Sequence, residues 1–289
     1  MWRVVAALLP ALGCGLYYFG LPAAQTLVVC VAACVAIEWA ITRWMLRRPS
    51  TISDGSAVIT GILLAMNLPA TLPWWMSLIG AFVAIGIAKM AFGGLGCNIF
   101  NPALVGRIFL LVSFPVAMTT WIAPDGTTGP TILGALSEGL SVDHYRGLPM
   151  ALGDMAGSMG ETASVAILVG LLFMLVTRVI TWHIPVAILG TVVLFDLAIG
   201  FPPMLDLLSG GLLLGAVFMA TDYVTSPVCT RGMLVYGVAI GVITVVIRRW
   251  GAYPEGMSFA IVIMNGFVPL INRYVRPRRF SPRRKEVRA

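Results

Sequence analysis

The chain has 289 residues, of which 59% are hydrophobic and 11% charged, and its formal net charge is +7. A soluble domain carries about a quarter charged residues, so the composition excludes an ordinary soluble protein and indicates a polytopic membrane protein. The positive charge lies largely in the tail at 274–289, where basic side chains meet anionic lipid, so it predicts a membrane contact and no nucleic-acid partner.

Apolar runs near the length of a membrane-spanning helix, about 20 residues, recur from end to end. They predict an all-α fold with about ten transmembrane helices. The predicted runs are 4–20, 22–45, 57–69, 73–92, 101–118, 162–181, 184–200, 204–220, 232–248 and 257–273. The runs at 57–69 and 204–220 are short or interrupted by Gly and Pro, which is typical of half-helices.

The positions of Lys and Arg predict the orientation in the membrane. Arg3 and the arginine cluster at 43–48 flank the first two runs, and the tail is basic. Both termini are therefore predicted to be cytoplasmic. The loop at 119–161 is rich in Asp and Glu and is predicted to face the periplasm. Arg248 and Arg249 fall on the outer side in this scheme, and nothing in the sequence explains them.

Two polar segments, 93–102 and 221–227, interrupt the apolar pattern, one in each half of the chain. Irregular backbone at membrane depth needs partners from the protein or from a water-filled cavity. Paired broken segments indicate an inverted repeat around a central site. The alternative is two unrelated helix starts with proline in the first turn.

The corresponding division has four parts. Residues 1–118 form the first helical half, 119–161 the outer loop, 162–273 the second half, and 274–289 the cytoplasmic tail.

Few ionisable residues lie in the runs. The candidates for a functional role are Glu38, Lys89, Asp196, Asp206 and Asp222. Asp222 lies in a broken segment beside Thr221 and Thr225, and such oxygen groups suit Na⁺ or a proton relay. The alternative is a helix N-cap. Lys89 is expected to extend its ammonium group to the membrane surface, and the other three acidic residues are expected at interfaces.

Several kinds of site are disfavoured. The chain has two histidines, His144 and His183, which excludes a histidine-rich metal or haem site. Neither a Walker-type phosphate loop nor a G-x-S-x-G nucleophile elbow occurs. The five cysteines lie in or beside apolar runs and are interpreted as small buried residues. An iron–sulfur ligand role is the alternative for Cys97 and Cys229.

The polar stretch at 125–131, Asp-Gly-Thr-Thr-Gly-Pro-Thr, lies between two apolar blocks. Taken alone it favours a turn, and an ordinary loop is the alternative interpretation. A threonine hydroxyl can also form a phosphoester that anchors a flavin by its phosphate. The flavin would then carry the redox chemistry while the protein orients it. Thr131 is the candidate attachment residue.

Several landmarks occur together in a fixed order. They are 54–57, 60–64, 93–96, 100–103, 182–185, 208–210, 221–222, 224–225, 250–256 and 268–271. With them, the chain resembles the RnfD family, which belongs to the Rnf complex, an ion-translocating ferredoxin:NAD⁺ oxidoreductase. It is similar, more distantly, to the NqrB component of the Na⁺-translocating NADH:quinone reductase.

The flavin motif of this family reads Asp-x-x-Ser/Thr-Gly-Ala-Thr, and its last threonine carries FMN. In this chain the motif corresponds to Asp125, Thr128, Gly129, Pro130 and Thr131, with proline in place of alanine. The resemblance therefore implies a covalent phosphoester between FMN and Thr131.

The resemblance also implies a fold of two inverted halves with broken half-helices, like that of urea and ammonium transporters. It implies electron passage coupled to movement of Na⁺ or H⁺ in a bacterial inner membrane. The implied partners are the other Rnf subunits, including a second covalent-FMN subunit and membrane iron–sulfur subunits, and a flavin transferase. Riboflavin or another second flavin is implied within the bundle. The alternatives are a cofactor-free channel or transporter of the same fold, and a structural scaffold subunit.

Overall fold

The computed structural model describes residues 1–47, 51–122, 128–129, 131–137, 153, 156–162, 164–251, 253 and 255–275. Helices dominate these residues. The first half contains α1 (Trp2–Ala40), η1 (Ile41–Met45), η2 (Ile52–Asp54), α2 (Ser56–Met66), α3 (Trp74–Phe82), η3 (Val83–Met90), α4 (Pro102–Ser113) and α5 (Pro115–Thr119).

A short segment separates the halves. It contains β1 (Trp121–Ile122), β2 (Thr128–Gly129) and α6 (Ile132–Ser137), and the two strands pair antiparallel with Trp121 opposite Gly129. The second half contains α8 (Ser164–Val176), α9 (His183–Ile199), α10 (Pro203–Leu208), α11 (Leu212–Leu214), η5 (Gly215–Met219), α12 (Thr230–Trp250) and α13 (Met257–Tyr274).

Each predicted apolar run contains helix. The boundary between the first two runs is confirmed, because α1 is broken at Gly20, whose φ of 61° and ψ of −139° are not helical. Among the described residues, two helical stretches are long and apolar enough to cross a membrane, Trp2–Met45 and Thr230–Trp250. The other apolar helices are shorter, so the number of crossings stays a prediction.

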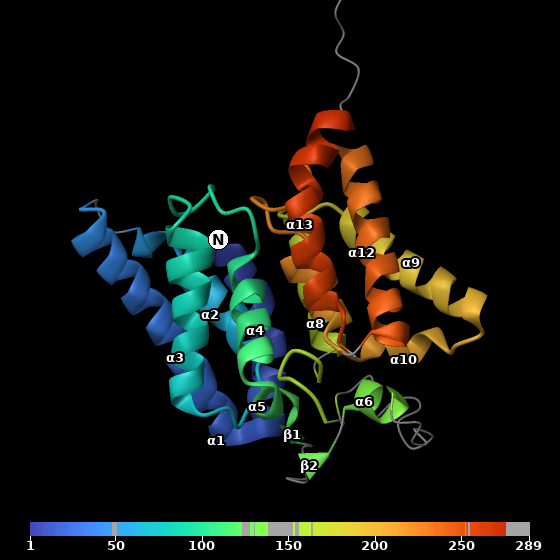
Figure 1. Ribbon diagram of the computed structural model, residues 1–289, viewed down its shortest axis with the longest axis horizontal. Coiled ribbons are helices and arrows are strands. Elements are labelled where there is room, and N and C mark those ends of the chain that lie inside the picture. The colour runs from blue at the N-terminus through green and yellow to red at the C-terminus, as the bar shows by residue number, and fades with distance from the viewer. Residues whose placement is uncertain are drawn as a thin grey trace, which may run out of the picture.

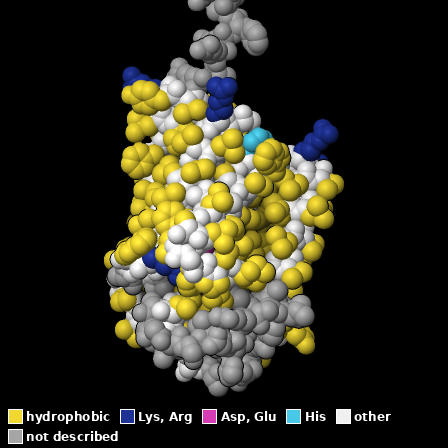
Figure 2. Space-filling view, turned by 90° about the vertical axis from the view of Figure 1, so that its right-hand side faces the viewer, with side chains coloured by type: hydrophobic (Ala, Val, Ile, Leu, Met, Phe, Trp, Pro, Cys, Tyr) yellow, Lys and Arg dark blue, Asp and Glu magenta, His cyan; other side chains and the backbone are white. Residues whose placement is uncertain are grey.

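The two halves lie side by side in Figure 1, with α1 to α5 on the left and α8 to α13 on the right. The N-terminus and the last turn of α13 lie in the upper half of this view, whereas β1, β2 and α6 lie at the lower end. Hydrophobic side chains cover much of the face in Figure 2, as expected for contact with lipid.

Two half-helices approach each other from opposite ends of the molecule. α2 follows Gly55 (φ 72°), close to Trp2 at the N-terminus, and α11 follows Gly211 (φ 63°), close to the segment that carries α6. A positive φ favours glycine because it has no Cβ. The C-terminal ends of α2 and η5 meet, since Asn67 Nδ2 lies 3.7 Å from Met219 Sδ.

Candidate functional site

A cavity that is partly open to solvent lies between the two halves near the N-terminus. Its lining is largely apolar, with polar groups from both broken segments. The polar residues that line it are Ser56, Thr60, Lys89, Asn98, Asn101, Thr221, Asp222 and Tyr223. Pockets for small molecules and cofactors are mostly apolar and carry a few well-placed polar groups. The cavity therefore has the chemistry of a ligand site.

A buried ion pair borders this cavity at the start of α2. Lys89 Nζ lies 2.5 Å from Glu38 Oε2 and donates to Ser56 Oγ at 2.7 Å, and both charged side chains are almost fully buried. The other Glu38 oxygen accepts from the Thr51 hydroxyl at 2.8 Å. The pair joins α1, η3 and α2. The expectation for Lys89 was wrong, because its ammonium group is paired inside the protein and does not extend to the membrane surface. The interface position expected for Glu38 stays a prediction.

Asp222 caps a turn and not a helix. Its carboxylate accepts from the Thr225 hydroxyl at 3.1 Å and faces the backbone N–H groups of Tyr223 and Val224. The next helix, α12, has Cys229 as its N-cap. The helix-cap alternative is therefore wrong, whereas the oxygen-rich surroundings expected for Asp222 are present on the wall of the cavity.

Side-chain amides connect the two broken segments in the interior. Asn101 caps α4 through its Oδ1 and donates from Nδ2 to the Met219 carbonyl at 3.2 Å. The amide of Asn265 satisfies its surroundings best when Nδ2 faces the Thr225 carbonyl (3.2 Å) and the Tyr236 hydroxyl (2.6 Å), and Oδ1 accepts from the Asn101 N–H at 3.1 Å. These bonds tie α4 and α13 to the segment that carries Asp222.

Arg107 of α4 lies beside the point where the half-helices meet. Its guanidinium donates to Asn67 Oδ1 at 2.8 Å and to Ser258 Oγ at 2.9 Å, and it forms an ion pair with Glu255. Glu161 also acts on it electrostatically. Arg107 is 3% exposed, so the first half contributes a buried cation to an interface made largely by the second.

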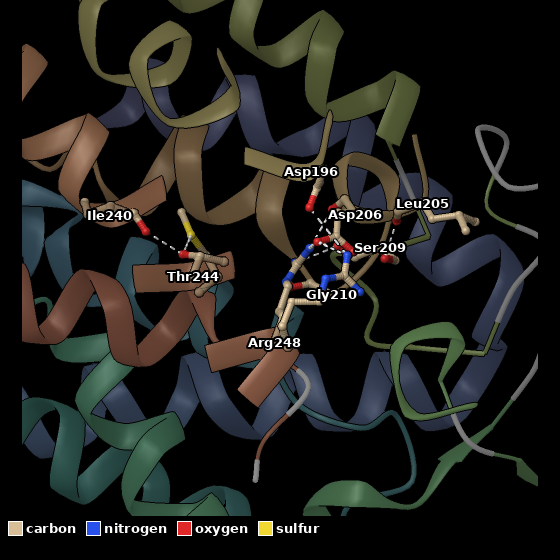
Figure 3. A network of polar contacts seen from close by, with 10 residues as sticks. Asp196, Leu205, Asp206, Ser209, Gly210, Ile240, Thr244 and Arg248 are labelled. Atoms are coloured by element: carbon tan, nitrogen blue, oxygen red, sulfur yellow. Dashed lines mark hydrogen bonds and ion pairs between the residues drawn. The ribbon is translucent and has the colours of Figure 1, made fainter. Parts of the chain in front are cut away.

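A second cluster of buried charges surrounds the start of α11, and Figure 3 shows it from close by. Arg248 donates to the backbone carbonyls of Asp206, Ser209 and Gly210 at 2.7, 3.0 and 3.4 Å. Arg249 lies 2.9 Å from Asp206 Oδ2 and 3.5 Å from Asp196 Oδ1. The cluster explains the two arginines that the sequence left unexplained, because their charges are paired inside the protein.

Asp196, Asp206 and Glu161 are buried inside the protein, which the sequence did not predict. Their depth and side in the membrane stay predictions. Glu161 is 3% exposed, and the adjoining Gly160 N–H donates to the Met66 carbonyl at the end of α2. Sequence reasoning missed the roles of Arg107, Glu161 and Glu255. The signal that marks Arg107 was visible, namely a lone arginine inside an apolar run.

Thr131 immediately precedes α6, and its Oγ1 accepts from the Gly134 N–H at 3.1 Å. The side chain is 5% exposed. Thr128 and Gly129 form β2, which pairs with β1 and precedes Thr131 in the chain. Asp125 and Pro130 of the predicted motif lie outside the described residues, as does His144 of the outer loop.

The cysteines differ in their exposure to solvent. Cys30 and Cys34 are buried as expected, whereas Cys97 is exposed and Cys229 is intermediate, so the buried interpretation does not hold for Cys97. No group of three or more His, Cys, Asp or Glu side chains that could hold a metal ion occurs in the described part of the chain.

Comparison with known proteins gives a consistent result. The family model described as NQR2, RnfD, RnfE family matches residues 1–281. The chain is 44% identical to the D subunit of the Na⁺-translocating ferredoxin:NAD⁺ oxidoreductase complex of Acetobacterium woodii, over 96% of this chain and 89% of the relative. It is 41% identical to the D subunit of the ion-translocating oxidoreductase complex of Stutzerimonas stutzeri, over 97% and 91% of the two chains. The D subunit of the proton-translocating ferredoxin:NAD⁺ oxidoreductase complex of Clostridium ljungdahlii is 40% identical, over 98% and 92%.

Proposed function

The chain belongs to the NQR2, RnfD, RnfE family, and we propose that it is the RnfD component of an ion-translocating ferredoxin:NAD⁺ oxidoreductase complex. In this proposal it passes electrons through a covalently bound FMN and couples their passage to translocation of Na⁺ or H⁺. The near full-length similarity to relatives named as the D subunit of such complexes supports the assignment. The protein acts as part of the assembly and not alone.

The single observation that carries the flavin proposal is Thr131 at the end of its motif. Thr131 Oγ1 acts as an acceptor toward Gly134, and an esterified oxygen keeps that capacity, so a phosphoester is compatible with the bond. The side chain is nearly buried. Attachment of FMN therefore requires the chain around Thr131 to move away, or attachment occurs before this chain packs. When bound, FMN supplies one- and two-electron transfer.

We propose that the cavity is the site of a second, non-covalent flavin such as riboflavin. A flavin ring has two apolar faces and a polar edge. The apolar walls of the cavity suit the faces, and the polar groups of Asn98 and Thr221 suit the edge. Asp222 and Thr221 lie at the same wall, and the Thr225 hydroxyl donates to Asp222, so these three residues are the candidates for the ion path.

We further propose an inverted repeat with a fold like that of urea and ammonium transporters. The correspondence between α2 and α11–η5 supports it: each half-helix follows a glycine with positive φ, each has a buried ion-pair cluster at its start, and the two ends meet. The proposed location is the bacterial inner membrane, with both termini cytoplasmic and the loop at 119–161 periplasmic.

The proposed partners are the other Rnf subunits, among them a second covalent-FMN subunit and membrane iron–sulfur subunits. A flavin transferase is needed for the attachment, and lipid surrounds the helices. The relatives are named as subunits of a complex, and this supports the other Rnf subunits as partners.

The test is flavin fluorescence of this protein on a denaturing gel, after expression of the complex with its flavin transferase. The wild-type band is expected to fluoresce, and Thr131→Ala is expected to lose the signal completely. Thr120→Ala is the matched control, because it removes a nearby exposed hydroxyl. Flavin released by acid from the Thr131→Ala protein would report the second flavin.

A non-fluorescent wild-type band would reject the covalent flavin. If ion flux then continued without electron transfer, the protein would be a channel or transporter. If neither ion flux nor electron transfer depended on its side chains, it would be a scaffold.

A further inference from the structure

Buried charges of alternating sign form a series through the interior. Its members are Glu255, Arg107, Glu161, Arg248, Asp206, Arg249 and Asp196. Direct ion pairs join the members at both ends, and Glu161 is near enough to Arg107 and Arg248 for both to act on its carboxylate electrostatically. The series runs from the meeting point of the half-helices to the start of α11.

This series begins and ends with a carboxylate, so its four carboxylates exceed its three guanidinium groups by one. An isolated ionised carboxylate in a medium of low polarity is strongly disfavoured, and such a group binds a proton or a cation instead. Two buried aspartate oxygens agree with an under-compensated negative charge. Asp206 Oδ1 and Asp196 Oδ2 have no hydrogen-bond partner among the residues that the structure describes.

We infer that Glu161 is a proton-binding site of this protein, which takes up a proton when an electron arrives and releases it when the electron leaves. The dependence on the electron rests on the proposed function. The other carboxylates have direct guanidinium partners: Glu255 pairs with Arg107, and both aspartates pair with Arg249. Glu161 instead accepts at Oε1 from the neutral hydroxyl of Ser158, at 3.0 Å.

The surroundings of Glu161 favour a proton over Na⁺. Sodium in proteins needs several oxygen ligands, as other hard cations do, and a guanidinium group on each side repels a second full cation. A proton forms an O–H bond to the carboxylate itself and needs little space. Gly157 approaches so closely that a Cβ there would lie 2.7 Å from Glu161 Oε2, so little room exists for a hydrated ion.

The position of the series connects Glu161 to both candidate sites. At the outer end, a Cβ on Gly210 would overlap both Leu133 and Arg248, and Leu133 lies two residues after Thr131. At the inner end, Arg107 donates to Asn67, which contacts Met219, and the Met219 carbonyl accepts from Asn101 on the cavity wall. The charge state of Glu161 can therefore respond to charge at Thr131 and to the contents of the cavity.

The proposed step conserves atoms and electrons. The complex supplies one electron to this protein, and the added negative charge favours formation of an O–H bond at Glu161 with a proton from water. When the electron passes to the next carrier, that bond breaks and the proton returns to water. One proton is bound and one is released for each electron that passes.

The test uses redox-induced infrared difference spectra of the assembled complex. Reduction of the wild type is expected to produce the carbonyl band of a protonated carboxylic acid, which shifts in D₂O. Glu161→Gln is expected to lose that band, and Glu255→Gln, a carboxylate with a direct ion pair, is expected to keep it. Flavin fluorescence on gels of the same samples shows whether the cofactor is present. A missing flavin would thus count against the proposed function and not against Glu161.

A milder variant keeps the test decisive if Glu161→Gln does not assemble. Ser158→Ala removes the hydroxyl donor and leaves the carboxylate, so it is expected to shift the frequency of the same band. Thermal unfolding of the reduced complex gives a second readout. The reduced, folded wild type binds one proton more than the unfolded chain at neutral pH, so its stability should fall as pH rises, and Glu161→Gln should lose this dependence.

Three outcomes would overturn the inference. The first is an infrared band that persists in Glu161→Gln, and the second is a band that is not shifted in Ser158→Ala. The third is an unfolding midpoint of the wild type that rises with NaCl but not with KCl, together with a midpoint of Glu161→Gln that rises with neither salt. The last result would make Glu161 a sodium site.

Discussion

The two half-helices are built alike but held differently. At the start of α2, one lysine faces one glutamate, and the charges of that pair balance. At the start of α11, two arginines face two aspartates, and the series extends through Glu161 to Arg107. A closed pair has one stable charge state, whereas an extended series with one excess carboxylate can gain or lose a proton. The first half-helix is therefore a fixed element, and the second lies beside charges that can change.

The largest expected effect on thermal stability comes from breaking the Lys89–Glu38 ion pair, the closed pair. Glu38→Gln leaves the Lys89 ammonium buried without its counter-charge, and breaking a buried pair in this way costs roughly 3–5 kcal/mol. We expect a large drop in the thermal unfolding midpoint of the purified protein in detergent. The double variant Glu38→Gln, Lys89→Met removes both charges and should recover much of the loss. An unchanged midpoint in the single variant would mean that the closed pair does not hold α2.

An intermediate effect on stability is expected from adding a methyl group at a tightly packed glycine, because the packing differs between the two half-helices. A Cβ at Gly61 of α2 would lie 2.7 Å from the Cα of Val31, which is backbone, whereas one at Gly215 of η5 would meet the flexible side chain of Met257. Overpacking a core costs typically about 1–3 kcal/mol.

We therefore expect Gly61→Ala to lower the unfolding midpoint more than Gly215→Ala does. Gly190→Ala, where a Cβ meets nothing within 4 Å, is the control. Equal losses at Gly61 and Gly215 would show that the two half-helices are equally rigid.

The smallest effect is expected for Asp196→Asn, the same carboxylate-to-amide change as at Glu38. Asp196 ends the series. Without its carboxylate, Arg249 still has two partners, Asp206 Oδ2 at 2.9 Å and the Phe201 ring, whose centre lies 3.5 Å from the guanidinium carbon. The change also removes the excess negative charge. The loss should stay below about 1 kcal/mol, as for substitutions that leave no charge unpaired. A loss of unfolding free energy as large as that of Glu38→Gln would show that the charges of the second cluster are also balanced and depend on Asp196.

The sequence was sufficient to locate the two broken segments and the helix break at Gly20, because Gly and Pro interrupt apolar runs for local reasons. It also placed Asp222 among oxygen groups correctly, since Thr225 is three residues away. It could not pair Glu38 with Lys89 or Asp196 with Arg249, because those partners lie on different helices. The burial of Glu161 was missed for the same reason. Its neighbours in sequence are polar, and its burial depends on contact with the end of α2, far away in the chain.

The meeting of α2 and η5 end to end has an electrostatic consequence. The C-terminal end of each helix carries about half a negative charge from its unpaired carbonyls, and here two such ends face the same point inside the protein. Their fields add where there is little water to weaken them. The positive charge of Arg107, buried beside this point, is stabilised by both. The backbone alone therefore favours a positive charge at this point, and the Arg107 guanidinium is the group that supplies it.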